Sequence, residues 1–249
     1  MSESMGTEID SESERRRRVF ITGGTRGIGL ATVRALAPSS EQIFILARDR
    51  QRLDSAIERL RTEYLGCEFV PVCADLSDLP TLRSELQRVP LKHLDALVLD
   101  AGTYTEGSLS TMNVADYQVD LNINLNSMLV VVQETLPALR LGLKARIVIV
   151  GSTAAYEPYP LVPSYGVAKF GVRGLAINLR QELVPDRIGV CLVSPGGTLT
   201  DMWEGEDLPV GRLLEPSDIA KVIEVSLSLS EQAVVDEVIV RPMLGDIHE

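Results

Sequence analysis

Short apolar runs alternate along the chain with longer segments in which apolar residues recur every three or four positions. The short runs predict buried strands, and the longer segments predict amphipathic helices. Strands are predicted at Val19–Thr22, Gln42–Leu46, Cys67–Val72, Ala96–Leu99, Arg146–Val150, Gly189–Val193 and Glu237–Val240. Helices are predicted at Gly27–Leu36, Gln51–Glu63, Leu79–Val89, Val114–Leu141, Ser164–Leu183 and Ser217–Ser228.

The regular alternation of strand and helix is typical of a parallel sheet covered on both faces. We therefore expect an α/β fold, a Rossmann-type doubly wound sheet of seven mainly parallel strands with helices on both faces. No long linker or repeat divides residues 15–249, so one domain is expected there. Residues 1–14 are polar and acidic without periodicity, which predicts a disordered tail.

Charge narrows the possible partners. The formal net charge of the 249 residues is −11, which disfavours binding to a phosphate backbone, so no nucleic-acid partner is expected. The basic run Arg15–Arg18 is interpreted as a solvated lead-in to the first strand, with a targeting or nucleic-acid segment as the alternative. No apolar stretch has transmembrane or signal-peptide character, so we expect a soluble, cytoplasmic protein without a membrane partner.

Cysteine and histidine usage argues against disulfides and metals. The three cysteines (67, 73 and 191) are an odd count without paired spacing, which favours buried structural thiols over a disulfide framework. The two histidines, His93 and His248, have no partner at metal-ligand spacing. No metal site is predicted.

A glycine motif, Thr22–Gly29 (TGGTRGIG), joins the first predicted strand to the first predicted helix. Glycines there allow a tight turn and the close approach of a pyrophosphate to the helix N-terminus, which attracts anions. The spacing Gly-x-x-x-Gly-x-Gly departs from the common Gly-x-Gly-x-x-Gly fingerprint. Its position between strand and helix nevertheless favours a dinucleotide site.

The residues after the second strand bear on the choice of cofactor. At this point a carboxylate would bind the adenosine ribose 2′-hydroxyl, whereas an arginine would pair with a 2′-phosphate. Arg48, together with Arg26 of the glycine motif, favours NADP(H). Asp49 is the counter-evidence, because a shift of one residue would put an acid at the selecting position and favour NAD(H). Solvated surface arginines are the remaining alternative.

Polar residues also follow the third and fourth strands, in Ala74-Asp75-Leu76 and Asp100-Ala101-Gly102. Ligands bind at the carboxyl ends of strands in open α/β sheets. Asp75 could accept a hydrogen bond from an adenine amino group, or it could cap the next helix. Both alternatives stay open at this stage.

A catalytic constellation follows the fifth strand. Ser152 lies at the strand end, and the next helix carries Tyr165 and Lys169, whose i, i+4 spacing puts them on one face. A free tyrosine has a pKa of about 10, too high for efficient proton transfer near neutrality. An ammonium one turn away stabilises the phenolate, as does a positive nicotinamide ring. Tyr-x-x-x-Lys alone arises by chance in many helices, but with Ser152 before it and the glycine motif upstream the pattern is specific.

In these motifs the chain closely resembles the short-chain dehydrogenase/reductase family, in its single-domain branch, over about residues 18–242. The resemblance rests on Thr22–Gly29, Asp75-Leu76, Ala101-Gly102, Asn124, Ser152, Tyr165, Lys169 and the segment Pro195–Thr200. It implies hydride transfer between a small carbonyl or alcohol substrate and NADP(H), with NAD(H) possible. A non-catalytic dinucleotide-binding regulator of the same fold is the alternative, disfavoured because Ser152, Tyr165 and Lys169 are all retained.

The resemblance also implies residue roles. Tyr165 would donate the proton in reduction, Ser152 would bind the substrate carbonyl, and Lys169 would bind the nicotinamide ribose and depress the pKa of Tyr165. Asn124, chosen over its neighbouring asparagines by its distance from Tyr117, would hold a water of a proton relay. The expected cofactor-binding residues are Gly23, Thr25, Arg26, Gly27, Ile28, Gly29, Arg48, Asp75, Leu76, Ala101, Gly102, Tyr165, Lys169, Pro195, Gly196, Thr198 and Thr200.

One position departs from the family. Where the family usually has Asn-Asn-Ala-Gly after the fourth strand, this chain has Leu99-Asp100-Ala101-Gly102. Asp100 is nearly isosteric with asparagine but has no amide group to donate. Because the asparagine is thought to brace the central sheet, the change implies looser cofactor geometry or lower stability without loss of the chemistry.

The substrate pocket is predicted from loop residues. Ser152, Tyr156 and Tyr159 would form one wall, and Met202 and Trp203 the other, with ordinary loop packing as the alternative for the aromatic residues. The predicted helices Val114–Leu141 and Ser164–Leu183 resemble those that form a four-helix interface in relatives. A homotetramer or homodimer is therefore expected.

Overall fold

The fold is seen in a computed structural model that describes residues 15–159, 162–203 and 209–246, except the side chain of Met202. Within these residues seven strands form one sheet in the order β3-β2-β1-β4-β5-β6-β7, and every pairing is parallel. The strands are β1 (Arg17–Thr22), β2 (Ser40–Ala47), β3 (Glu68–Cys73), β4 (Ala96–Leu99), β5 (Arg146–Val150), β6 (Gly189–Pro195) and β7 (Glu237–Val240). The predicted doubly wound sheet is confirmed.

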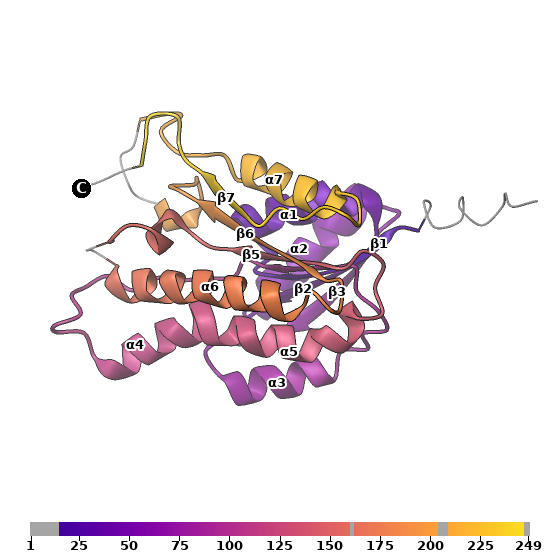
Figure 1. Cartoon of the computed structure of the whole chain (residues 1–249), viewed down its shortest axis with the longest axis horizontal. Helices are drawn as coiled ribbons and strands as arrows, with labels where there is room; N and C mark the ends of the chain where they lie inside the picture. Colours follow the sequence, from indigo (N-terminus) through magenta and orange to yellow (C-terminus); the bar gives the residue numbers. More distant parts are fainter. Residues whose placement is uncertain (1–14, 160–161, 204–208, 247–249) are drawn as a thin grey trace, which may run out of the picture.

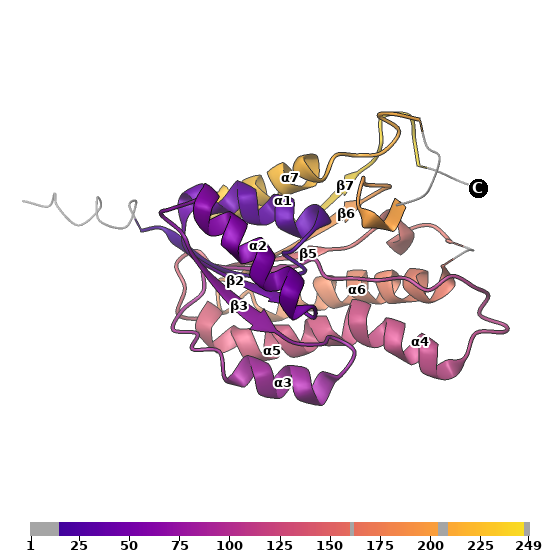
Figure 2. The same cartoon turned by 180° about the vertical axis from the view of Figure 1, so that it is seen from behind.

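Helices cover both faces of the sheet. Figures 1 and 2 show α3, α4, α5 and α6 on one face and α1, α2 and α7 on the other. The helices are α1 (Gly27–Leu36), α2 (Arg50–Glu63), α3 (Leu79–Gln87), α4 (Val114–Leu121), α5 (Ser127–Leu139), α6 (Pro163–Glu182) and α7 (Pro216–Ser228). Short turns of helix are η1 (Ala37–Ser39), η2 (Asn122–Asn126), η3 (Thr153–Ala155) and η4 (Asp201–Trp203).

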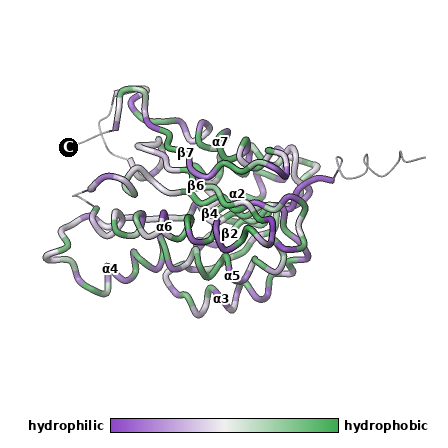
Figure 3. The backbone as a smooth tube through the Cα atoms, viewed as in Figure 1, coloured by the Kyte–Doolittle hydropathy of each residue, from purple (hydrophilic) through white to green (hydrophobic). Residues whose placement is uncertain are grey.

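The strands are apolar on both sides because both sides are covered. Successive side chains of β1 alternate between the faces, so Phe20 packs in one hydrophobic cluster and Val19 and Ile21 pack in the other. The hydrophobic colouring of the central strands in Figure 3 follows this arrangement. The two clusters hold the sheet rigidly, which fixes the loops at its carboxyl edge.

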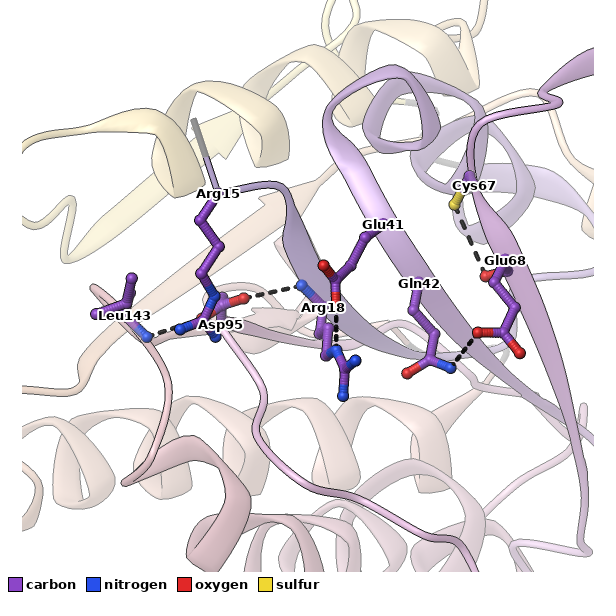
Figure 4. Close-up of polar contacts among 8 residues, drawn as sticks. All are labelled: Arg15, Arg18, Glu41, Gln42, Cys67, Glu68, Asp95 and Leu143. Carbon is purple, nitrogen blue, oxygen red and sulfur yellow. Dashed lines mark hydrogen bonds and ion pairs between the residues drawn. The ribbon is translucent and has the colours of Figure 1, made fainter. Parts of the chain in front are cut away.

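Polar contacts close the amino edge of the sheet (Figure 4). The buried Asp95 carboxylate accepts the backbone N–H groups of Arg18 and Leu143, each at 2.8 Å. It thereby joins β1, the start of β4 and the loop before β5. On the neighbouring strands Gln42 donates to Glu68 at 2.6 Å. The contacts at this edge are structural. Ligands bind at the opposite edge, the carboxyl ends of the strands, in open α/β sheets.

The basic run Arg15–Arg18 is bound to this amino edge. Arg15 forms an ion pair with Asp95 at 3.3 Å. Arg16 donates to the carbonyl oxygen of Gly66 at 2.7 Å. These contacts hold the run against the fold. The sequence had been interpreted as a solvated lead-in without such contacts. The predicted tail, residues 1–14, lies outside the described residues.

One long predicted helix, Val114–Leu141, is divided in the structure. The π-helical turn η2 separates α4 from α5. A π turn adds a residue to the local repeat and rotates the following side chains, and such turns occur often at functional sites. Asn124 lies at its centre and is fully buried. Hydropathy averaged over the segment gives no sign of one extra residue per turn.

The described residues also contain no helix long and apolar enough to cross a membrane. The same residues contain no group of histidine, cysteine, aspartate or glutamate side chains that could hold a metal ion. The three cysteines, all described, are free thiols.

Candidate active site

A deep cavity opens at the carboxyl edge of the sheet. The connections that follow the neighbouring strands β1 and β4 leave in opposite directions, which creates a crevice between them. The cavity has a volume of about 900 Å³ and is lined by loops that follow β1 to β6. Pockets for small molecules and cofactors have volumes of about 300–1,000 Å³. These loops lie at the left of Figure 1.

The glycine loop forms one wall. Gly23 has a φ of +80°, and a Cβ there would lie 2.9 Å from the Cα of Ala101. A Cβ on Gly29 would lie 2.3 Å from the carbonyl oxygen of Gly23, so only glycine fits at either position. Helix α1 begins at Gly27, and its N-cap residue Arg26, whose side chain has no acceptor for the helix N–H groups, donates to Asp201. No side chain caps α1, and the Gly29 N–H bonds to the Asp100 carboxylate, so the N–H groups of Gly27 and Ile28 are the ones that remain for an anion.

Three arginines line the end of the cavity next to β2: Arg26, Arg48 and Arg52. The Asp49 carboxylate, which also lines the cavity, accepts the Arg52 backbone N–H at 3.0 Å and caps α2. Sequence reasoning missed Arg52, although its position in the first turn of α2, three residues after Asp49, was the available signal. This end of the cavity therefore holds three guanidiniums, beside the carboxylates of Asp49, Asp75 and Asp201.

Asp75 also lines this end of the cavity. Its carboxylate accepts hydrogen bonds from the backbone and the hydroxyl of Ser77, both at 2.8 Å. Helix α3 is capped instead by Asp78, which accepts from the Thr81 backbone N–H. The structure thus decides against the helix-cap alternative for Asp75.

Ser152, Tyr165 and Lys169 meet in the cavity wall near the end of β5. Ser152 accepts the Ala154 N–H at 3.1 Å, and a hydrogen bond joins it to the Tyr165 hydroxyl. The Lys169 Nζ lies 5.3 Å from the centroid of the Tyr165 ring and donates to the carbonyl oxygen of Val150 at 3.0 Å. The spacing on α6 therefore places Tyr165 and Lys169 together, and the end of β5 brings Ser152 to them.

The pKa of Tyr165 is raised from its ordinary value. Burial of the hydroxyl is the main cause, the hydrogen bond with Ser152 opposes it, and the negative charge of Asp100 adds to the rise. The resemblance implied a depression by Lys169. The ammonium, however, lies over the ring and bonds to Val150. In this arrangement Tyr165 holds its proton at neutral pH.

Asp100, a partly exposed residue of the cavity lining, places a second ionisable group beside Lys169. Burial raises the pKa of Asp100 to about 7, against the opposing effects of Lys169 and the Gly29 N–H. Burial lowers the pKa of Lys169 to about 8, opposed by the charge of Asp100. Desolvation outweighs mutual attraction for both groups. The two therefore titrate close to each other and near neutrality.

Asn124 lies behind the cavity wall. Its side-chain oxygen accepts the Thr103 N–H at 3.1 Å, and its amide donates to the carbonyl oxygen of Asp120 at 2.9 Å. The Asp120 carboxylate accepts in turn from Ser164 at 2.5 Å, which links α4 to the start of α6. The side chain of Asn124 thus positions the loop after β4, and the carboxylate of Asp120 ties α4 to the helix that carries Tyr165.

Three of the predicted substrate residues line the cavity: Ser152, already described, and Tyr159 and Trp203 at its other end. Tyr156 does not join them, which corrects the prediction. Its hydroxyl bonds to Glu237, and its ring packs under the Arg173 guanidinium at 4.5 Å. The side chain of Met202 lies outside the described residues. Sequence reasoning missed Thr103, Tyr104, Glu106, Ile123, Pro158 and Val162, which also line this end.

The predicted cofactor residues gather in the same cavity. Those in its lining are Gly23, Thr25, Arg26, Gly27, Ile28, Arg48, Asp75, Leu76, Ala101, Gly102, Tyr165, Lys169, Pro195, Gly196, Thr198 and Thr200. Gly29 instead packs against Gly23 and the Asp100 carboxylate, so it shapes the loop from behind.

Comparison with known proteins decides the family. The family model for short chain dehydrogenases matches residues 17–209. The chain belongs to the short-chain dehydrogenase family. It is an oxidoreductase of a family that binds a nicotinamide dinucleotide and acts on small molecules.

Relatives match over almost the whole chain. An uncharacterized oxidoreductase of Staphylococcus epidermidis is 28% identical over 225 residues, 90% of this chain and 96% of the relative. The sepiapterin reductase of Chlorobaculum tepidum is 28% identical over 241 residues, 93% of this chain and 98% of the reductase. A short chain dehydrogenase from Burkholderia cenocepacia, solved in complex with NADP, has a TM-score of 0.80 at 27% identity, covering 91% and 95% of the two chains.

The cavity of this short-chain dehydrogenase fits a nicotinamide dinucleotide. The glycine loop leaves room for phosphates where a Cβ would intrude, and Gly27 and Ile28 of the first turn of α1, which no side chain caps, line the cavity. From this point the lining continues to the arginines beside β2 in one direction and to Tyr165 and Lys169 in the other. A ribose bound beside Lys169 would meet an ammonium donor.

Asp100→Asn is predicted to change how stability depends on pH. The unfolded pKa of this aspartate is 3.8 and the folded pKa is about 7, so its stabilising contribution is present below pH 3.8 and lost as the pH rises toward 7. Asparagine mimics the protonated acid. The stability of the variant relative to the original should therefore rise by on the order of 2 kcal/mol between pH 5 and 7.5.

Thermal unfolding at several pH values measures this effect. About 2 kcal/mol corresponds to roughly 4–8 °C in Tm for a protein of this size. Asp116→Asn, which changes an exposed acid in the first turn of α4, is the matched control. Parallel curves of Tm against pH for the original protein and Asp100→Asn would show that Asp100 stays ionised in the fold.

Proposed function

We propose that the protein is an NADP(H)-dependent carbonyl reductase or alcohol dehydrogenase, with Ser152, Tyr165, Lys169 and Asn124 as its proton-handling residues. The observation that carries this proposal is the hydrogen bond between Ser152 and Tyr165, with the Lys169 ammonium over the ring, in the wall of one large cavity. When bound, the nicotinamide supplies or accepts the hydride. The chain supplies orientation and the proton.

The proton steps follow from the positions of the side chains. A substrate carbonyl oxygen within reach of Ser152 and Tyr165 would accept two hydrogen bonds, which polarise the carbonyl. As charge develops on that oxygen, the Tyr165 hydroxyl gives up its proton. Its raised pKa keeps Tyr165 protonated at neutral pH, which suits the acid needed for reduction. Lys169 would hold the nicotinamide ribose, and Asn124 would hold a water of a proton relay behind Lys169.

Charge at the adenosine end supports NADP(H) over NAD(H). A 2′-phosphate needs cationic donors, and Arg26, Arg48 and Arg52 all line this end of the cavity. Asp49, the residue that would favour a ribose hydroxyl, uses its carboxylate to cap α2. The Burkholderia cenocepacia relative was solved with NADP, which points the same way.

Arg52→Gln is expected to weaken the binding of NADPH and to leave the binding of NADH nearly unchanged. Loss of one charge-assisted contact at an exposed site should raise the Kd for NADPH about 10-fold, while the Kd for NADH changes less than about 2-fold. Titration of cofactor fluorescence measures both constants. Arg50→Gln is the matched control, because Arg50 pairs with Asp54 on the same helix. Equal losses for NADPH and NADH would argue against a 2′-phosphate contact.

The test of the function is the loss of NADPH absorbance at 340 nm with a panel of ketones, aldehydes and 3-ketoesters. Turnover that requires NADPH and is abolished in Tyr165→Phe supports the proposal, and the best substrate indicates the class. A preference for NADH would overturn the cofactor assignment. Cofactor binding without turnover on any carbonyl would favour the non-catalytic regulator.

We also propose that the chain assembles as a homotetramer or homodimer. The outer face of α6 exposes Val167, Phe170 and Ile177, whose side chains are 42%, 52% and 49% exposed. Apolar patches of this kind are typical of subunit interfaces. Light scattering in solution measures the assembly. The cytoplasmic location stays a prediction.

A further inference from the structure

Two of the three arginines at the adenosine end, Arg26 and Arg52, are already engaged by a carboxylate of the chain itself. Asp201 accepts a hydrogen bond from Arg26 at 2.8 Å, and its carboxylate lies 3.9 Å from the Arg52 guanidinium. Arg26 comes from the glycine loop, Arg52 from the first turn of α2, and Asp201 from η4 after β6. One carboxylate therefore bridges two guanidiniums that belong to segments far apart in the sequence.

The segment that carries Asp201 folds over the glycine loop. A Cβ on Gly27 would lie 3.0 Å from Thr200 Cγ2, so the residue before Asp201 is in close contact with the start of α1. Two residues after Asp201, Trp203 lines the substrate end of the cavity, and a Cβ on Gly197 would lie 3.4 Å from its ring. The turn η4 therefore connects the arginines to the substrate wall.

A 2′-phosphate and the Asp201 carboxylate require the same donors. Both are anionic oxygen groups that bind guanidinium N–H groups, and two anions at one pair of arginines repel each other. Arg26, Arg52 and Asp201 are each about half exposed, so their ion pairs are weak enough to exchange. NAD(H) has no group that competes for these arginines.

We propose that Asp201 is a specificity-determining residue that competes with the cofactor 2′-phosphate for Arg26 and Arg52, and that its release moves the η4 turn beside the substrate. The proposal rests on the NADP(H) preference proposed above. Recognition of the 2′-phosphate is thereby coupled to the substrate wall through a single short turn. Because the 2′-phosphate must displace Asp201, the affinity for NADP(H) is lower than it would be without this carboxylate. The displacement repositions Trp203.

The binding test uses adenosine fragments, which report on this end of the cavity without turnover. Adenosine 2′,5′-bisphosphate carries the 2′-phosphate, and adenosine 5′-monophosphate does not. In Asp201→Asn the Kd for the bisphosphate should fall about 3- to 10-fold, while the Kd for the monophosphate stays within about 2-fold. Asp201→Glu keeps the carboxylate and should stay near the original protein. Calorimetry measures all the constants.

Asp54→Asn is the matched control, because it removes an acid paired with Arg50 on the outside of α2. If Asp201→Asn and Asp54→Asn show the same ratio of bisphosphate to monophosphate affinity, the competition is refuted. If the original protein binds both fragments equally, the NADP(H) preference fails, whatever the effect of Asp201→Asn. The two failures are therefore distinguishable.

The coupling has its own reporter, since Trp203 is the only tryptophan of the chain. The bisphosphate should change the emission of Trp203 in the original protein, although it does not reach the substrate end. The monophosphate should leave the emission unchanged, and in Asp201→Asn the response to the bisphosphate should be largely lost. An identical emission response to both fragments would overturn the coupling.

Discussion

Replacing Tyr165 with phenylalanine is expected to lower kcat for carbonyl reduction about 10²- to 10⁴-fold. The change removes one hydroxyl, and with it the proton donor and one of the two groups proposed to polarise the carbonyl. The ring remains, so the contact of Lys169 Nζ with it is retained. Cofactor affinity should therefore stay within about 3-fold. Steady-state kinetics and cofactor titration separate these two effects.

Tyr156→Phe is the control for this substitution, since it removes a hydroxyl from a tyrosine only nine positions earlier. That hydroxyl bonds to Glu237 and Ser194. The control should lose on the order of 1 kcal/mol of stability and keep kcat within a few-fold. A Tyr165→Phe variant with nearly full activity would require another proton donor, and a Tyr156→Phe variant as inactive as Tyr165→Phe would mean that both act through the fold.

The contrast between these two tyrosines also shows where sequence reasoning ended. The glycine motif and the i, i+4 pair Tyr165 and Lys169 are local patterns whose geometry is dictated by one loop or one helix. The direction of Tyr156 depends on η3, which Ser152 caps, and on Glu237 in β7. Such long-range contacts leave no periodic trace, so an aromatic residue near the site was wrongly assigned to the substrate wall.

The fold was predictable to within a few residues for most elements, because buried parallel strands read as apolar runs and their helices as amphipathic segments. The segment 114–141 is the exception. Its hydropathy is continuous, and the π turn that buries Asn124 depends on contacts with Thr103 and Asp120. The bridge from Asp201 to Arg26 and Arg52 was also beyond prediction, since its members are more than 140 residues apart.

Lys169→Met is expected to lower kcat/KM by at least about 10²-fold and to weaken the binding of the cofactor. Methionine keeps the length and apolar character of the side chain but removes the ammonium beside Tyr165. Without that charge the pKa of Asp100 should rise above about 7, so Asp100 takes up a proton at neutral pH. The substitution therefore leaves no isolated buried charge behind.

The stability of Lys169→Met distinguishes a chemical role from a structural one. The pKa of Lys169 falls from 10.5 to about 8 on folding, so its contribution to stability is present above pH 10.5 and lost as the pH falls through 8. At pH 7 the burial of a charged ammonium lowers the free energy of unfolding of the original protein, and the variant has no such charge. The Tm of the variant should therefore equal or exceed that of the original at pH 7, and this advantage should shrink as the pH rises toward 10.

Lys221→Met, an exposed lysine of α7 paired with Asp218, provides the control and should leave kcat/KM and the pH dependence of Tm unchanged. A Lys169→Met variant that is inactive but as stable as the original at pH 7 supports a role for the ammonium in the chemistry. Loss of activity together with a large loss of Tm at pH 7 would instead assign Lys169 to the scaffold. In that case its bond to the Val150 carbonyl, which ties α6 to the end of β5, would be its main contribution.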